Sequence, residues 1–157
     1  MDTINISENT SEEVSVTASK PENSPAVVIC MQGAPYVGKG THSKDLAKSL
    51  GYVHVSTGDL LRMEKENGTD IGKALMMEGG GLVPDEIVTE LLRRYVKRMI
   101  EDRVPGFILD GYPRTGPQVP QLMGLLNELG LRLSRVINLV APREELLRRA
   151  QKRVDET

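Results

Sequence analysis

The sequence has little of what several kinds of site and location require. Cys30 is its single cysteine, so an intramolecular disulfide and a zinc site built from cysteines are both excluded. No stretch approaches the roughly 20 apolar residues of a membrane-spanning helix. The N-terminus has neither the hydrophobic segment of a signal peptide nor an arginine-rich transit pattern. These absences predict a soluble protein in the reducing cytoplasm.

An excess of charge of one sign is also missing. The 20 basic and 22 acidic residues are mixed along the chain and give a formal net charge of -2. No broad electrostatic field is therefore available to hold a nucleic acid or an anionic membrane surface. We expect neither as a partner, and any anionic ligand has to be bound by a local site.

The length of 157 residues is typical of one domain with a single core. Residues 1–25 are rich in Ser, Thr, Glu and Asn and carry two prolines near their end, which predicts a disordered N-terminal tail. A short capped helix beginning in ISENTSEEV is the alternative. The folded domain is predicted to span residues 26–157.

Strand and helix patterns alternate within this domain. Short apolar runs predict strands at about residues 26–32, 52–56, 106–110 and 135–140. Apolar residues at three- and four-residue steps predict helices at about residues 39–50, 60–66, 71–77, 85–100, 117–129 and from 143 onward. The alternation predicts a three-layer α/β fold with a parallel sheet.

A glycine-rich turn follows the first predicted strand and opens a helix. It reads GAPYVGKGT over residues 33–41, so its backbone N–H groups would face an anion at the positive end of the helix dipole. Lys39 would reach the β- and γ-phosphates of a nucleotide. The alternative is a tight turn with a solvated lysine. The strand before the turn and the helix after it favour a P-loop.

This turn and three later segments resemble adenylate kinases. The family's usual form, GxPGxGKGTQ, is matched at Gly33, Pro35, Gly38, Lys39, Gly40 and Thr41. Tyr36 and His42 depart from it, and Tyr36 replaces a glycine that tolerates unusual dihedral angles. The other segments are STGDLLR at 56–62, GLVPD at 81–85 and GFILDGYPRTGPQ at 106–118. Each alone could be a cap, a helix start or a turn, but together and in order they predict a P-loop nucleoside monophosphate kinase.

The resemblance implies two nucleotide subsites. ATP would contact Gly33, Tyr36, Val37, Gly38, Lys39, Gly40, Thr41, Arg149 and Arg153. AMP would contact Thr57, Arg62, Gly81, Leu82, Val83, Gly111, Tyr112, Pro113, Arg114 and Gln118, within or near an AMP-binding insertion at about residues 56–85. The implied catalytic residues are Lys39, Arg114, Arg149 and Asp110. Asp110 would also order Mg²⁺ through water.

The implied reaction is reversible phosphoryl transfer from Mg-ATP to AMP, which gives two ADP. Guanidinium groups suit it because they hold phosphate oxygens bidentately while water is excluded. Thr57 favours AMP, since UMP/CMP kinases usually carry alanine there, and UMP/CMP kinase is the alternative within the class. For Arg62 and Arg114 the alternative is a surface salt bridge. For Arg149 and Arg153 it is a solvated basic helix face.

Other residues carry less specific signals. Gly79–Gly81 fits either a hinge of the AMP-binding region or a helix stop. Cys30 and the methionines at positions 76 and 77 are predicted to pack in the core. His42 and His54 have no partner pattern that suggests a metal, and we expect both to be structural.

The resemblance covers roughly residues 26–153, and the sequence then ends where the family continues into a lid. The family's C-terminal strand and helices are therefore expected to be missing. Val154 and Asp155 resemble part of a lid segment, in which case Arg153 matches a different lid arginine. A nucleotide-binding protein without efficient transfer is the second alternative, indicated by Tyr36 and by this ending. An unpaired apolar sheet edge would favour self-association.

Overall fold

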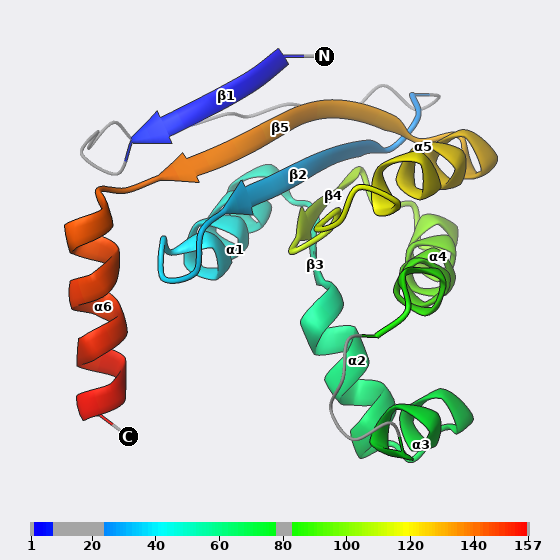
Figure 1. The fold of residues 1–157 in the computed structure, drawn as a ribbon. Coiled ribbons are helices and arrows are strands. Elements are labelled where there is room, and N and C mark those ends of the chain that lie inside the picture. The colour runs from blue at the N-terminus through cyan, green and yellow to red at the C-terminus, as the bar shows by residue number, and fades with distance from the viewer. Residues whose placement is uncertain (1, 8–23, 78–82, 157) are drawn as a thin grey trace.

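A parallel sheet of five strands forms the centre of the fold in the computed structural model, which describes residues 2–7, 24–77 and 83–156 (Figure 1). The strands are β1 (Asp2–Ser7), β2 (Val27–Gly33), β3 (Val53–Ser56), β4 (Gly106–Asp110) and β5 (Arg132–Val140). Their order in the sheet is β1-β5-β2-β4-β3, and every neighbouring pair is parallel. The four strands predicted from apolar runs are confirmed.

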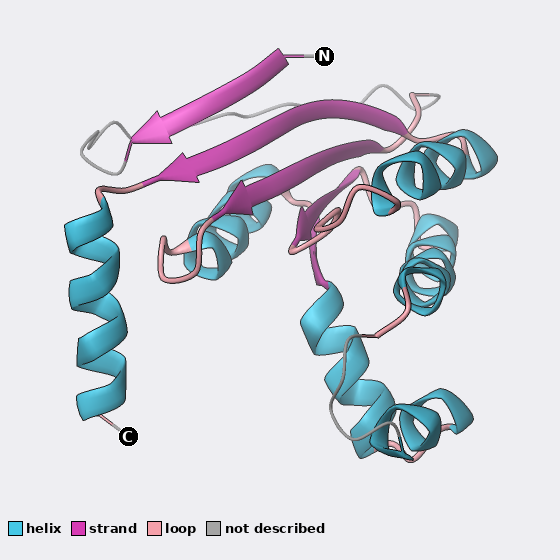
Figure 2. Cartoon of the chain, in the orientation of Figure 1, coloured by secondary structure: helices cyan, strands magenta, loops and turns pink. Residues whose placement is uncertain are grey.

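Helices lie on both faces of this sheet, and α3 packs against α2 away from the strands (Figure 1). The described helices are α1 (Lys39–Leu50), α2 (Thr57–Glu66), α3 (Asp70–Met77), α4 (Asp85–Glu101), α5 (Gln118–Leu129) and α6 (Arg143–Asp155). At one end of the sheet, loops lead from β2, β4 and β5 into α1, α5 and α6, whereas β3 runs directly into α2 (Figure 2). None of the described helices is long and apolar enough to cross a membrane.

Alternate residues of β2 divide the interior into two apolar clusters. Val28 and Cys30 belong to one cluster, to which α4 and α5 contribute buried side chains. Ile29 and Met31 belong to the other, which includes side chains of α1 and, at its margin, of α6. Because successive strand residues point to opposite faces, the central strands are covered on both sides. The predicted three-layer α/β fold is confirmed.

Residues 2–7 correct the prediction for the N-terminus. We predicted a disordered tail over residues 1–25, but Asp2–Ser7 forms strand β1 beside β5. The sequence TINIS contains β-branched residues that favour strands, but its partner lies far away in sequence, so local composition did not indicate the pairing. The alternative of a helix beginning in ISENTSEEV is wrong for Ile6 and Ser7. The rest of that stretch lies outside the described residues.

The same strand changes the predicted sheet edge. We expected an unpaired apolar edge at the place where the family's C-terminal strand completes the sheet. In the structure β1 pairs with the outer side of β5, with Asp2 opposite Arg135 and Ser7 opposite Val140. The prediction of an unpaired edge beside β5 is therefore wrong.

Candidate functional site

The loop of residues 33–41, which we call the phosphate loop, is a tight connection from β2 to α1. Val37 is 1% exposed and anchors the loop in the interior, and its N–H donates to the Ala34 carbonyl at 3.3 Å. A Cβ at Gly33 would lie 2.7 Å from Val37 Cγ1 and 3.2 Å from the Leu139 carbonyl, so only glycine fits there. Gly38, with φ of 91°, caps the N-terminus of α1 in a left-handed conformation. The loop thus presents the N-terminus of α1 in the form that binds anions.

A cavity of about 760 Å³ opens beside this loop. Its lining residues are Gly33, Ala34, Pro35, Tyr36, Gly38, Lys39, Gly40, Thr41, Arg114, Arg149 and Arg153. All residues predicted to contact ATP are among them except the buried Val37. The volume lies within the range typical of ligand pockets. Four cationic side chains in one cavity favour a ligand with several negative charges.

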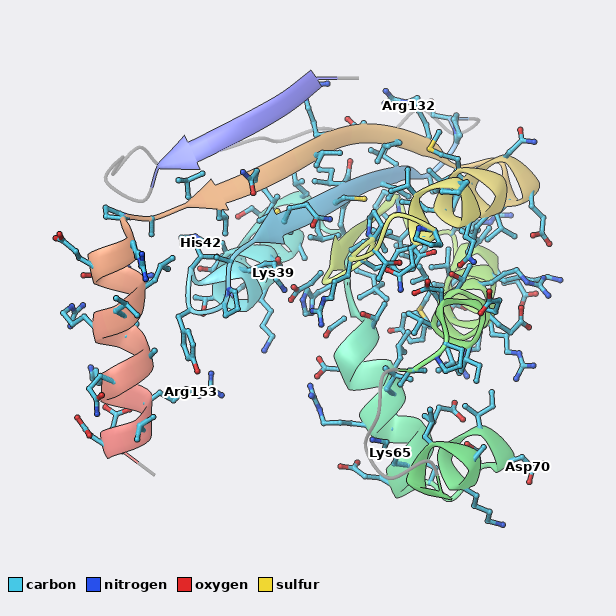
Figure 3. The ribbon with its side chains drawn as sticks, in the orientation of Figure 1. Lys39, His42, Lys65, Asp70, Arg132 and Arg153 are labelled. Carbon is cyan, nitrogen blue, oxygen red and sulfur yellow. The ribbon has the colours of Figure 1, made fainter. Side chains whose placement is uncertain are left out.

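Two elements bring cations to this cavity from opposite parts of the sequence. Lys39 is on α1 and Arg153 is on α6, and Figure 3 shows the Arg153 side chain extending from α6 toward α1. The Arg149 guanidinium donates through Nη1 to the Tyr36 carbonyl at 3.1 Å and through Nε to Glu145 Oε1 at 2.9 Å. Hydrogen bonds from Arg148 and Arg149 lower the pKa of Glu145 to about 2. Arg149 thereby ties α6 to the loop.

Asp110 is the last residue of β4 and contacts both Lys39 and His54. The Lys39 ammonium donates to Asp110 Oδ1, and His54 Nε2 lies 2.9 Å from Asp110 Oδ2. Burial, the largest influence, raises the pKa of the Asp110 carboxyl, but hydrogen bonds and charges from Lys39 and His54 outweigh it and leave that pKa lowered. The carboxylate is therefore ionised at neutral pH and poised beside the loop.

The surroundings of Asp110 fit a magnesium ion held through water. Its Oδ2 would lie 3.7 Å from a Cβ at Gly40, so the carboxylate faces the backbone of the phosphate loop. Mg²⁺ is commonly bound by one or two carboxylates, by substrate phosphates and by retained waters. No group of three or more His, Cys, Asp or Glu side chains in the described part of the chain could hold a metal. A magnesium ion at Asp110 would therefore need oxygens of a bound phosphate and waters as its further ligands.

The residues predicted to contact AMP are only partly brought together. Arg114 lines the cavity, whereas Arg62 forms an exposed ion pair with Asp59 and does not line it. Thr57 is buried at the start of α2, and its hydroxyl donates to the Gly111 carbonyl at 3.4 Å. Gly111 has φ of 84°, and a Cβ there would lie 2.9 Å from Arg114 Nη2. Glycine is favoured here by this left-handed backbone, because the Arg114 guanidinium is the end of a flexible side chain and could move aside.

Gln118 and Tyr112 hold the segment that follows β4. Gln118 Oε1 accepts from the Arg114 N–H at 2.7 Å, and its Nε2 donates to Asp85 Oδ1 at 2.9 Å. The buried Tyr112 shares a 2.7 Å hydrogen bond with the Thr89 hydroxyl, and the Tyr112–Pro113 peptide bond is cis. These contacts fix the backbone that carries Arg114.

Three further predicted AMP contacts lie in the glycine-rich segment before α4. Val83 is half-buried and packs against the larger apolar cluster. Gly81 and Leu82 lie outside the described residues, as does the Gly79–Gly81 run for which a hinge or a helix stop was predicted. Their placement relative to the cavity stays a prediction.

His54 is the site residue that sequence reasoning missed. We expected it to be structural, since no partner pattern suggested a metal. Its contact with Asp110 depends on the pairing of β3 with β4, in which Ser56 lies opposite Asp110. His54 is two residues before Ser56, and strand alternation therefore places both side chains on the same face of the sheet. This spacing is the sequence feature that could have indicated the contact with Asp110.

Comparisons with known proteins agree with this geometry. The protein-family model for adenylate kinase matches residues 31–157. An adenylate kinase of Anaeromyxobacter dehalogenans (strain 2CP-1 / ATCC BAA-258) is 42% identical over 125 residues, which are 78% of this chain and 58% of that protein. An adenylate kinase of Methanosarcina barkeri (strain Fusaro / DSM 804) is 41% identical over 128 residues, which are 80% and 59% respectively. The chain thus spans less than two thirds of the length of these relatives.

Proposed function

The chain belongs to the adenylate kinase family, and we propose that it transfers a phosphoryl group reversibly from Mg-ATP to AMP, giving two ADP. One observation carries this proposal. The phosphate loop with Lys39 shares a single cavity with Arg114 from the segment after β4 and with Arg149 and Arg153 from α6. Phosphoryl transfer depends on such positioned charge, because its transition state spreads negative charge over the transferred oxygens.

Each cation has a proposed place on the donor nucleotide. Backbone N–H groups of the phosphate loop and Lys39 would hold the β- and γ-phosphates, with Gly33, Tyr36, Val37, Gly38, Gly40 and Thr41 forming the loop around them. Arg149 and Arg153 would approach from α6. A phosphate would give Lys39 a second anionic partner besides Asp110. Mg²⁺, when bound, would neutralise phosphate charge, and Asp110 would hold it through water.

The acceptor nucleotide is proposed to lie on the α2 side of the cavity. Arg114 would hold the AMP phosphate and direct it in line with the γ-phosphate, so that no general base is needed. Thr57 would contact the base and favour adenine. The other proposed contacts are Arg62, Gly81, Leu82, Val83, Gly111, Tyr112, Pro113 and Gln118. Arg62 would have to exchange Asp59 for the phosphate, which its exposed position allows.

We place this activity in the cytoplasm, with ATP and AMP as soluble partners and Mg²⁺ as cofactor. Cys30 supports a reducing location only weakly, because it is buried and burial raises the pKa of its thiol to about 12, which makes it unreactive.

Nucleotide binding without efficient transfer is a second candidate. It is favoured by Tyr36, a non-glycine residue with φ of 68° inside the phosphate loop. Backbone strain at Tyr36 would weaken the binding of the phosphates by the loop.

Parallel measurements of binding and turnover separate these candidates. Titration calorimetry with ATP and with diadenosine pentaphosphate measures binding, and a coupled assay measures ADP production with AMP, CMP or UMP as acceptor. The proposal expects binding, and turnover that is fastest with AMP. Binding without turnover would instead support the second candidate, and absence of binding would contradict both.

A further inference from the structure

One face of α4 carries three polar side chains that contact α5 or the segment before it. They lie four residues apart and are Asp85, Thr89 and Arg93, which we call the α4 stripe. Residues at this spacing lie on one face of a helix. The Thr89 hydroxyl donates to Gln121 Oε1 at 2.6 Å, and Arg93 Nη1 donates to Glu128 Oε1 at 3.1 Å. The α4 stripe therefore ties α4 to the neighbouring α5 (Figure 1).

Asp85, the first residue of the α4 stripe, fixes the amide of Gln118. Asp85 Oδ1 accepts from Gln118 Nε2 at 2.9 Å. Gln118 Oε1 accepts from the backbone N–H groups of Arg114 at 2.7 Å and Thr115 at 3.4 Å. An ionised carboxylate only accepts hydrogen bonds, so the NH2 end of the amide faces Asp85 and its oxygen faces the backbone. Because Gln118 is 5% exposed, loss of Asp85 would leave this NH2 group buried without that partner.

The position of Arg114 depends on its backbone more than on its own side-chain contacts. Arg114 lines the cavity, and its guanidinium has no carboxylate partner among the residues that the structure describes. Two residues earlier, the Tyr112 hydroxyl shares a 2.7 Å hydrogen bond with Thr89. Thr89 therefore holds the chain before Arg114 through Tyr112. Asp85 holds the chain after it through Gln118.

We propose that Asp85 and Thr89 are positioning residues that set the place of Arg114 in the cavity. Asp85 acts through the Gln118 amide and Thr89 through the Tyr112 hydroxyl, since neither is among the described residues that line the cavity. A displacement of about 1 Å in a catalytic group can cost about a hundredfold in rate, so small shifts of this backbone matter. That Arg114 meets a phosphate rests on the proposed function, whereas the link from α4 to its backbone does not.

The first experiment measures this link without a nucleotide, by hydrogen exchange of single amides in NMR. Asp85→Ala should speed exchange of the Arg114 amide at least about tenfold, because the side chain that accepts its N–H is no longer held. Asp85→Asn keeps an oxygen acceptor and should restore slow exchange. The matched control, Glu86→Ala, removes an exposed carboxylate from the same first turn of α4 and should leave exchange unchanged. Unchanged exchange in Asp85→Ala, or equally fast exchange in Glu86→Ala, would overturn the role of Asp85.

Thr89→Val tests the second link in a variant of nearly the same shape, in case Asp85→Ala does not fold. It removes the hydroxyl that contacts Tyr112, so the Arg114 amide should again exchange faster, while amides of β2 keep the parent rate and show that the fold is intact. Thr89→Ser returns a hydroxyl and should restore slow exchange. Unchanged exchange of the Arg114 amide in Thr89→Val would overturn the role of Thr89.

Turnover separates positioning from a purely structural role. In the coupled assay, at a temperature well below unfolding, Asp85→Ala should lower kcat at least about tenfold. The KM for ATP should stay unchanged, because the proposed ATP contacts lie on the phosphate loop and α6. Asp85→Asn should return kcat to within about twofold of the parent, and Glu86→Ala should keep the parent kcat. Faster exchange of the Arg114 amide with an unchanged kcat would overturn the positioning role. A parent without turnover would contradict the proposed function, and the exchange experiment would still decide the link.

Discussion

His54 Nε2 lies 2.9 Å from Asp110 Oδ2, so a histidine of β3 holds a carboxylate at the end of β4. Both side chains are largely removed from water, and Asp110 also contacts Lys39. His54→Leu should therefore lower the free energy of unfolding by about 1.5 to 3 kcal/mol, the usual contribution of a hydrogen bond to a charged group. Urea unfolding measures the change. Lys44→Leu, at an exposed position of α1, is the control and should change stability less; equal losses would contradict the role of His54.

Asp110 should also make stability depend on acidity. Its pKa is lowered in the folded protein because Lys39 and His54 outweigh the effect of burial. A carboxyl whose folded pKa lies below its unfolded pKa stabilises the fold above the unfolded value, and this contribution is lost as pH falls through the folded value. The stability difference between the parent and Asp110→Asn should therefore be largest near neutral pH and shrink below about pH 4. A difference that is constant from pH 7 to pH 3 would show that Asp110 titrates normally.

Tyr36→Gly should stabilise the protein and strengthen ATP binding. Tyr36 has φ of 68°, a left-handed conformation that costs about 1 to 2 kcal/mol for a residue with a side chain. Glycine removes this cost but adds about 0.5 to 1 kcal/mol of chain entropy, so the midpoints of the two ranges give a net gain of about 0.75 kcal/mol in thermal unfolding. Arg103 has φ of 58° in the turn after α4. Arg103→Gly should give a similar gain in stability without changing ATP affinity, and an equal effect of both variants on affinity would exclude a specific role of the loop.

Much of the fold was predictable because its signals are local. The apolar run that became β2, the glycine-rich turn after it and the helix that begins at Lys39 lie next to one another in sequence. β1 was not predictable in this way, because its pairing depends on Arg135–Val140 at the far end of the chain. The short strand β1 lies among polar residues and is stabilised by pairing with the edge of β5. That edge exists only once the sheet has formed.

The site was predictable to the extent that motifs fix backbone shape. Lys39 and Arg114 reach one cavity because each follows the carboxyl end of a parallel strand, and these ends lie at the same edge of the sheet. Side-chain partners were not fixed in this way. Arg62 pairs with the neighbouring charge of Asp59 on the surface of α2. His54 contacts Asp110, and this contact depends on the register between β3 and β4.

Lys39→Met should abolish phosphoryl transfer while the chain still folds. The substitution removes a charge aimed at the phosphates and leaves the loop backbone unchanged. A loss of at least about a hundredfold in kcat is expected, which is typical of a single preorganised electrostatic group. Lys44→Met, on the exposed side of the same helix, should keep the parent rate. Near-normal turnover of the Lys39 variant, with circular dichroism unchanged, would refute the P-loop mechanism.

Thr57→Ala should weaken the preference for AMP more than it slows transfer. Thr57 is buried at the start of α2, and its hydroxyl donates to the Gly111 carbonyl beside Arg114. Loss of one hydrogen bond to a base is worth about 0.5 to 1.5 kcal/mol, so the ratio of kcat/KM for AMP to that for CMP should fall by about two- to tenfold. The coupled assay with both acceptors gives this ratio directly.

The matched control for this prediction is Thr69→Ala. The Thr69 hydroxyl accepts the Gly72 N–H at 3.0 Å near the start of α3 and does not line the cavity. Its loss should lower stability by about 1 kcal/mol, as for other helix caps, and leave the AMP-to-CMP ratio unchanged. Equal ratios in the parent and in Thr57→Ala would mean that the base does not lie beside Thr57. A fall in the AMP-to-CMP ratio for both variants would instead mean that the ratio falls because the α2–α3 region loosens. The Thr69 hydroxyl lies in that region but does not line the cavity, so it could affect the ratio only in this indirect way.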